Sequence, residues 1–213
     1  NSCKTVYSNT VTVTVFADEV PASINGNQTI CYNIVPSLLS TVTPASGGNG
    51  SFTYQWQSST DNVNFSDISG ATNLSYQPQA LTQTTYFRLK QQSCKTVYSN
   101  TVTVNVYSDV LAGSINGSQS ICYSTVPNPI LSSSLPSGGN GSFTYQWQSS
   151  TDNVNFSDIS GATSATYQPQ TLTQTTYFKR KEVTSCKTVY SNTVTVTVFA
   201  DVVLGTIGEN QTI

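Results

Sequence analysis

Threonine and valine alternate strictly at 10–15, TVTVTV, and this is the clearest strand signal in the chain. Val11, Val13 and Val15 share one face of such a strand, and the threonines between them share the other. One face is then buried and the other solvated, as in an antiparallel sandwich. Because the alternation returns at 101–104 and 193–196, we predict that the strand occurs three times.

Shorter strand signals, separated by turn residues, fill the intervals between these copies. In the first interval we predict strands at 23–31 (interrupted at Asn25-Gly26), 38–42, 51–57, 63–68, 74–76 and 84–90. Short strands with a turn signal roughly every 8 to 12 residues are typical of a β-sandwich. No stretch shows a convincing helical period, so the predicted fold class is all-β.

Aromatic side chains mark the predicted core. Phe52, Tyr54 and Trp56 alternate along the predicted strand 51–57 and so project from one of its faces. Tyr86 follows a turn, at the place of the tyrosine corner of a sandwich. The core residues that we predict are Trp56, Tyr54 and Tyr86 in the first unit and Trp147, Tyr145 and Tyr177 in the second.

Long blocks of sequence repeat without change. SCKTVYSNTVTV occurs at 2–13, 93–104 and 185–196, and the 26-residue block at 47–72 returns at 138–163. Trp56 and Trp147 lie 91 residues apart (147 − 56). A fixed period of this length indicates a tandem array of small domains, each able to bury one modest core.

The repeat sets the predicted domain boundaries. We predict the last strand of a preceding repeat at 1–19, repeat 1 at 20–108, repeat 2 at 109–200 and the first strand of a following repeat at 201–213. The chain begins and stops in the middle of the pattern, so we expect it to be a piece of a longer array. No apolar run approaches the length that spans a membrane.

Composition narrows the class of protein. Only 8% of the residues are charged, histidine and methionine are absent, and the formal net charge is −2 with a pI of about 4.8. Nucleic-acid-binding proteins carry a basic footprint, so no nucleic-acid partner is expected. Low charge together with threonine–valine alternation indicates an extracellular all-β protein rather than a cytosolic enzyme.

The motifs GNQTIC, GGNGSFTYQWQSSTDNVNFSDISGAT, YQPQALTQTTYFRL and SCKTVYSNTVTVTV resemble the immunoglobulin-like repeats of giant surface proteins in Bacteroidetes. They are most similar to the SprB-type gliding-motility adhesins that the type IX secretion system exports. The resemblance covers essentially the whole chain. It implies tandem immunoglobulin-like antiparallel β-sandwiches in a filament on the outer surface of a Gram-negative bacterium. It also implies that gliding and secretion machinery act through other parts of the parent protein.

The five cysteines allow two pairing schemes. Bridges Cys31–Cys94 and Cys122–Cys186 leave Cys3 to pair with a residue before the chain begins. Bridges Cys3–Cys31 and Cys94–Cys122 leave Cys186 to pair after it ends. We favour the first scheme, because we expect each of its bridges to join two points at one pole of a domain, whereas a whole strand separates the partners in the second. Such bridges would limit how far a loaded repeat can stretch, or would simply stabilise a small secreted domain.

Other motifs predict no chemistry. Asp61, Asn62, Asn64 and Asp67 offer oxygen atoms to a calcium ion, but a polar hairpin turn explains them better. The GGNG loop at 47–50 precedes a strand and lacks the lysine of a phosphate-binding loop. The cysteines are too widely spaced for a metal site. We predict no catalytic residue, no cofactor and no metal, because no nucleophile has a base near it in the sequence.

Two classes of function remain. A structural and adhesive stalk needs only identical folded repeats, whose partners are the neighbouring repeats of the same chain and the substratum. A multivalent module that binds surface polysaccharide needs a weak site on each repeat, for which the candidate tyrosines are Tyr7, Tyr98, Tyr190, Tyr32 and Tyr123. Packing across strands or at domain poles is the alternative role for these tyrosines. Accessory domains of a secreted enzyme are a third interpretation.

Overall fold

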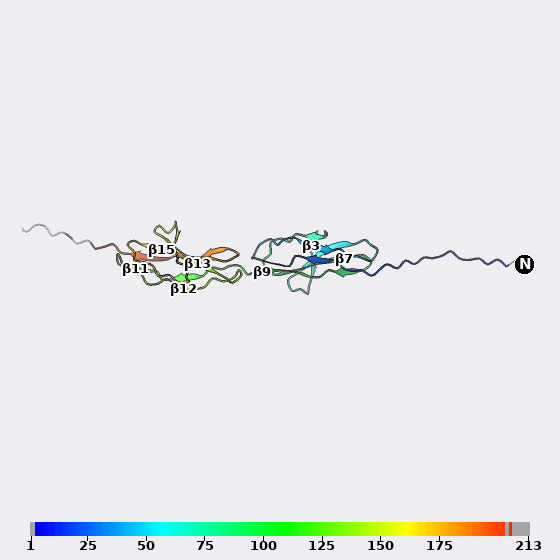
Figure 1. Cartoon of the computed structure of the whole chain (residues 1–213), viewed down its shortest axis with the longest axis horizontal. Coiled ribbons are helices and arrows are strands. Elements are labelled where there is room, and N and C mark those ends of the chain that lie inside the picture. Colours follow the sequence, from blue (N-terminus) through cyan, green and yellow to red (C-terminus); the bar gives the residue numbers. More distant parts are fainter. Residues whose placement is uncertain (1–2, 203–204, 206–213) are drawn as a thin grey trace, which may run out of the picture. The chain divides into compact units, whose positions relative to one another are not determined.

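The computed structural model describes residues 3–202 and 205, and every element in that part of the chain is a β-strand (Figure 1). Two compact units form, Asn1–Val106 and Tyr107–Ile213. We call them unit 1 and unit 2. The prediction of an all-β fold built from tandem sandwiches is confirmed.

Unit 1 contains two sheets. The strands are β1 Ser23–Asn25, β2 Gln28–Ile30, β3 Leu39–Thr43, β4 Thr53–Ser59, β5 Ser66–Asp67, β6 Ser75–Tyr76, β7 Thr85–Gln92, β8 Thr96–Tyr98 and β9 Val102–Val106. The smaller sheet has the order β1-β3-β6. The larger has the order β2-β9-β7-β4-β5, with β8 also paired to β7. Each predicted strand between 23 and 90 therefore has a counterpart in the structure.

The first strand of unit 1 changes sheets halfway along. β1 pairs antiparallel with β3 in the small sheet, whereas β2 pairs parallel with β9 in the large one. Between them Gly26 has φ of +125°, and a Cβ there would lie 2.6 Å from the Leu39 Cδ2 atom. The sheets are thus antiparallel apart from this one pair, so the large sheet is mixed rather than purely antiparallel.

A compact hydrophobic core joins the two sheets of unit 1. Its buried members are Ile24, Leu39, Trp56, Phe87, Leu89, Val102 and Val104. Trp56 is fully buried, and its indole N–H donates to the Asn73 carbonyl at 2.9 Å. Tyr76 packs against Trp56 with ring centroids 5.9 Å apart. The valines of β9 supply one wall, as the alternation of residues 101–104 predicted for this copy.

Unit 2 repeats this arrangement. Its strands are β10 Ser114–Asn116, β11 Gln119–Ile121, β12 Leu131–Ser134, β13 Thr144–Ser150, β14 Ser157–Asp158, β15 Thr176–Val183, β16 Thr188–Tyr190 and β17 Val194–Val198. The large sheet has the order β11-β17-β15-β13-β14, with β16 on β15, and β10 pairs with β12 in the small one. The core cluster is centred on Trp147, with Ile130, Phe178, Val194 and Val196.

One pair of predicted core residues is wrong. Tyr86 and Tyr177 are only half-buried and belong to neither core cluster, whereas the next residues, Phe87 and Phe178, are buried members. Trp56 and Trp147 are confirmed as core residues, and Tyr54 packs against the first cluster. Tyr145 is half-buried and lies beside the Arg180 guanidinium, with 4.7 Å from Cζ to the ring centroid.

The N-terminal copy of the TVTVTV strand lies outside both sandwiches. Residues 10–15 form no strand in the described structure, and Val11, Val13 and Val15 are 79%, 82% and 87% exposed. Its assignment to a preceding repeat stays a prediction. The predicted strand of a following repeat at 201–213 lies almost wholly outside the described residues.

Candidate functional site

Each unit has a pole where the chain enters its sandwich, which we call the N-terminal pole. In unit 1 it consists of residues 17–20, the glycine loop at 46–50 and the β7–β8 turn at 93–95. The Gly48 N–H donates to the Ala17 carbonyl at 2.9 Å, and the Ser93 hydroxyl donates to Asn49 Oδ1 at 2.7 Å. The GGNG motif is thus a structural loop, as its sequence context indicated, and it clamps the entering chain against the β7–β8 turn.

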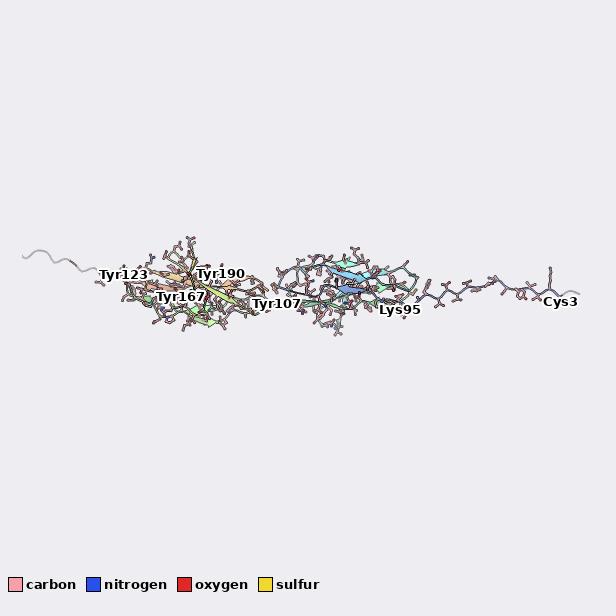
Figure 2. All side chains as sticks on the ribbon, in the orientation of Figure 1. Cys3, Lys95, Tyr107, Tyr123, Tyr167 and Tyr190 are labelled. Atoms are coloured by element: carbon pink, nitrogen blue, oxygen red, sulfur yellow. The ribbon has the colours of Figure 1, made fainter. Side chains whose placement is uncertain are left out.

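Charged side chains hold the entering chain against the β7–β8 turn at this pole. The Lys95 ammonium contacts the Asp18 carboxylate, and its hydrogen bond lowers the pKa of Asp18 and raises that of Lys95. The Lys95 backbone N–H donates to Glu19 Oε1 at 2.9 Å. Figure 2 shows Lys95 at the end of unit 1 where the N-terminal segment joins it.

Unit 2 builds the same pole with different residues. The Gly139 N–H donates to the Ser108 carbonyl at 3.0 Å, and Thr184 Oγ1 donates to Asn140 Oδ1 at 2.9 Å. Lys187 Nζ lies 2.6 Å from Asp109 Oδ1, and this hydrogen bond lowers the pKa of Asp109. Lys95, next to Cys94, and Lys187, next to Cys186, are therefore ion-pairing residues of the two N-terminal poles.

The opposite, C-terminal pole is where the chain leaves the sandwich. In unit 1 Ile30 pairs with Val106, the last residue of β9, so Cys31 lies directly beyond this end of the sheet. In unit 2 Ile121 pairs with Val198 in the same way and precedes Cys122. Figure 2 shows Tyr123 at the end of unit 2 where the chain departs, with Tyr107 at the other end of the same unit.

The structure therefore separates the two cysteines of each unit. β9 runs antiparallel to β7 with Thr85 opposite Val104, so Cys31 lies near the start of β7 and Cys94 lies beyond its end at Gln92. Seven residues of strand span about 23 Å. A disulfide requires Cα atoms within about 7 Å.

Neither predicted pairing scheme is present. Cys31 and Cys186 are disulfide-bonded, whereas Cys3, Cys94 and Cys122 are free and exposed. The favoured bridges Cys31–Cys94 and Cys122–Cys186 are wrong because they join opposite poles. The error lies in the course of the 23–31 segment, whose second half runs parallel to β9 and carries Cys31 to the far end of the sandwich.

The outer face of the large sheet carries a cation between two aromatic rings. Arg88 Cζ lies 4.1 Å from the ring centroids of both Phe65 and Tyr98. In unit 2 Lys179 Nζ takes this place, 4.0 Å from Phe156 and 4.7 Å from Tyr190. Tyr98 and Tyr190 thus pack across strands, which was the alternative to stacking on a sugar. All five candidate tyrosines, Tyr98 and Tyr190 included, are at least 40% exposed.

In the acidic turn after β4, hydrogen-bond donors of neighbouring residues satisfy the Asp61 carboxylate. Asp61 Oδ1 accepts from the Ser59 hydroxyl and from the N–H groups of Val63 and Asn64, and Oδ2 accepts from the Asn64 amide. These bonds, chiefly that from the Asn64 N–H, hold the pKa of Asp61 well below its usual range. Asn62 adopts a left-handed φ of 60° at the turn. The interpretation of this segment as a polar turn accounts for every one of these bonds.

Within the described residues, no group of three or more His, Cys, Asp or Glu side chains is arranged to hold a metal ion. No helix in the described part of the chain has the length and apolar character needed to cross a membrane. The predicted absence of catalysis and of a cofactor stays a prediction.

Unit 2 buries an ion pair that the sequence analysis did not identify. Arg180 and Glu182 are both fully buried, and Arg180 Nη2 lies 2.7 Å from Glu182 Oε1. The equivalent residues of unit 1 are the uncharged Leu89 and Gln91, which are also fully buried. The signal was available in the period of two, since Arg180 and Glu182 lie two and four residues after Phe178 and so fall on the same, buried face of β15.

Comparison with known proteins gives the family and a set of similar structures. The family described as "Domain of unknown function (DUF8696)" matches residues 20–108 and 111–200. No curated protein matches the chain.

Solved structures of tandem immunoglobulin-type domains resemble the chain at low identity. Sidekick-1 immunoglobulin domains 1–4 match with 11% identity over 84% of this chain and 48% of that one, at a TM-score of 0.43. Titin domains A168–A170 match with 14% identity over 84% and 67%, at 0.43. Extracellular domains 3–5 of Drosophila OTK match with 11% identity over 86% and 62%, at 0.44. The chain spans about half the length of the Sidekick-1 structure.

Proposed function

The chain belongs to the family described as Domain of unknown function (DUF8696), and from this premise we propose that it is a non-catalytic, load-bearing segment of an extracellular adhesin stalk. The observation that carries the proposal is the parallel pairing of the first and last strands of each unit. β2 pairs with β9 through Gln28–Val104, Thr29–Asn105 and Ile30–Val106. β11 pairs with β17 in the same register.

This pairing gives each unit a shear geometry. Chain enters at the N-terminal pole and leaves at the C-terminal pole, so tension on the two ends pulls β2 and β9 along their axes in opposite directions. All hydrogen bonds between the strands then bear the load together, whereas strands pulled apart from one end lose their bonds one at a time. The clamp of Gly48 on Ala17 adds a further attachment where the force enters.

The near-identity of the two units supports a structural role, because the same unit then serves at every position and contacts mainly its neighbours. A disulfide and a low charge content fit an oxidising, extracellular location. We further propose that the parent protein is a SprB-type filament on the surface of a Gram-negative bacterium. In this proposal, type IX secretion exports the filament and it acts in attachment and gliding. The motifs quoted above support this finer proposal.

Force spectroscopy on the whole chain in reductant tests the proposal. We expect two unfolding events, each releasing on the order of 250 Å of chain from a sandwich of the size of Ser23–Val106. A chain that extends smoothly, without discrete events, would show that the units bear no load.

A polar hollow on unit 1 favours a second candidate function, the binding of surface polysaccharide. The hollow holds about 240 Å³ and is lined by Thr53, Tyr54, Gln55, Asp67, Lys90 and Gln92. An aromatic ring beside carboxylate, amide and ammonium groups suits a sugar. A glycan array probed with the chain and with its Asp67→Asn variant separates the functions: binding lost in the variant favours polysaccharide, and no binding favours the stalk.

A further inference from the structure

A second hollow lies at the N-terminal pole of unit 1, where the entering chain passes the glycine loop and the β7–β8 turn. It holds about 450 Å³, which is within the range of small-molecule sites. We call it the entry hollow, and Lys95, one of its residues, is labelled in Figure 2. Its wall includes Phe16, Asp18, Glu19, Gly48, Cys94 and Lys95.

Glu19 brings an unused hydrogen-bond acceptor to this wall. Its side chain is buried, since the residue is only 7% exposed. Oε1 accepts from the Lys95 backbone N–H at 2.9 Å. Oε2 is the one buried side-chain oxygen or nitrogen in the described part of the chain that has no hydrogen-bond partner. Because buried polar atoms nearly always have a partner, this oxygen points to a ligand that donates a hydrogen bond.

The fold does not require a carboxylate at this position. The equivalent residue of unit 2 is Val110, which is also buried. A Cβ on Gly48 would lie 3.0 Å from Glu19 Oε1, and one on the equivalent Gly139 would lie 3.1 Å from Val110 Cγ2. Both side chains therefore occupy the same place beside the glycine loop. Since valine fills that place without any polar atom, packing alone does not explain the carboxylate of unit 1.

The entry hollow has a net negative charge. The charges of Lys95 and Asp18 offset each other in an ion pair, and the charge of Glu19 remains. The hydrogen bond to Asp18, and to a smaller extent the charge of Glu19, raises the pKa of Lys95. A cationic ligand suits this balance, and the Phe16 ring offers an apolar surface in the same wall.

Cys94 adds a reactive group to the entry hollow. It is a free, exposed thiol, whereas the equivalent Cys186 of unit 2 is disulfide-bonded. A thiol in its thiolate form attacks a disulfide and forms a mixed disulfide. The unused acceptor, the negative charge and the thiol together match a small ligand that carries both an ammonium group and a disulfide.

We propose that the entry hollow is a site of S-thiolation, at which Cys94 exchanges with the disulfide of a small aminothiol. The Cys94 thiolate attacks one sulfur of the ligand, and the S–S bond of the ligand breaks. A new S–S bond joins Cys94 Sγ to that sulfur. The other half of the ligand leaves as a thiolate and takes up the proton that Cys94 lost. The ammonium group of the retained half faces the Glu19 carboxylate.

This site is independent of the load-bearing role proposed above. Cys94 lies beyond the end of β7 at Gln92, whereas the parallel pair consists of β2 and β9. Thiolation of Cys94 therefore leaves the hydrogen bonds of that pair in place. Either proposal can fail without the other.

A comparison of two disulfides of similar size tests the proposal. Cystamine carries two ammonium groups, and hydroxyethyl disulfide carries hydroxyl groups in their place. The whole chain is treated briefly with each reagent near neutral pH, quenched with acid and digested with trypsin without reductant. Cys94 falls in peptide 91–95 and Cys122 in peptide 96–179, so mass spectrometry gives the rate of thiolation at each. Cys122 is also free and exposed but lies at a C-terminal pole, so it corrects for the intrinsic reactivity of the reagents.

At low salt we expect the preference for cystamine over hydroxyethyl disulfide to be about five-fold greater at Cys94 than at Cys122. Two opposite unit charges about 4 Å apart in water produce a ratio of this size. High salt should remove the excess, because it screens the attraction. Equal preferences at Cys94 and Cys122 at low salt would overturn the proposal.

Glu19→Gln supplies the matched variant, because it keeps an oxygen for the Lys95 N–H and removes the charge. Its preference at Cys94 should fall to that of Cys122, while its rate with hydroxyethyl disulfide stays unchanged and shows that the pole is intact. Asp201→Asn removes a carboxylate of unit 2 and should retain the excess. An excess that persists in Glu19→Gln, or in the unaltered chain at high salt, would contradict the assigned role of Glu19.

Discussion

At the scale of single residues, the two repeats place different side chains at two equivalent buried positions of the long strands β7 and β15. Unit 1 buries Leu89 beside Gln91, and the Gln91 side chain accepts from the Ala22 N–H at 2.8 Å. Unit 2 buries Arg180 beside Glu182, which accepts from the Gly113 N–H at 2.8 Å. A Cβ on Gly113 would lie 2.9 Å from Arg180 Nη2, so glycine in place of alanine makes room for the guanidinium.

Removal of one partner of this pair should destabilise unit 2. Glu182→Gln leaves the Arg180 charge buried without a carboxylate, at a cost of about 3–5 kcal/mol in the free energy of unfolding. The double variant Arg180→Leu/Glu182→Gln recreates the pair of unit 1 and should lose much less. Calorimetry of the unit 2 transition measures both. Equal losses in the single and double variants would show that the ion pair is not coupled.

The Asp61 turn and its copy at Asp152 should make stability depend on acid pH. Hydrogen bonds lower the pKa of each carboxyl in the folded state, headed by the N–H groups of Asn64 and Asn155. The unfolded value is about 3.9, so the stabilisation is complete above that pH and is lost as pH falls through the folded pKa.

The test is the difference in Tm between the chain and its Asp61→Asn/Asp152→Asn variant. We expect a lower Tm for the variant at pH 7 and a difference that shrinks as the pH falls from 5 to 2. Asp201→Asn removes a carboxylate outside the strands and serves as the control. A difference that stays constant with pH would contradict the role of the ionised carboxylates.

At the scale of elements, the glycine loop of the N-terminal pole has two glycines with nearly the same backbone but different surroundings. Gly47 has φ of +81° and Gly50 has φ of +80°. A Cβ on Gly47 would lie 2.0 Å from the Asp18 carbonyl oxygen, whereas one on Gly50 meets nothing within 4 Å. Alanine at Gly50 would therefore introduce backbone strain alone, whereas alanine at Gly47 would introduce the same strain and also a steric clash with the entering chain.

Gly47→Ala should therefore destabilise unit 1 more than Gly50→Ala. Both variants place a side chain at positive φ, which costs about 1–2 kcal/mol. Gly47→Ala must also displace the backbone of the entering chain, and we expect a further cost of about 1–3 kcal/mol. Denaturant unfolding measures the difference. Similar values for the two variants would mean that the clamp contributes little.

The positions of the strands could be predicted from the sequence, but the pairing between strands could be predicted only in part. Alternation at 101–104 identifies the buried face of β9, because burial follows a local period of two. Tyr86 and Phe87 are adjacent and both aromatic, so the period does not say which one faces the core. The parallel pairing of β2 depends on the crossing between sheets at Gly26, which no local pattern encodes. The pole of Cys31, and hence its pairing, was wrong for this reason.

At the scale of the whole molecule, the structure describes two copies of one folded unit, each with its own core, its own clamped N-terminal pole and its own parallel terminal pair. Different residues fill several positions, as at Leu89 and Arg180, yet the large sheets have the same strand order and their parallel pairs the same register. Both repeats retain the parallel terminal pair, and the central claim of the proposed function is that this pair carries tension.

The most direct test compares two directions of pulling on the whole chain in reductant. Handles at the two ends of the chain load β2 and β9 of unit 1 in shear. Handles at 32 and 107 pull the same two strands apart from their shared end at the C-terminal pole. We expect an unfolding force of unit 1 several-fold higher for the first direction. Equal forces in both directions would contradict the proposal that the parallel pair bears the load.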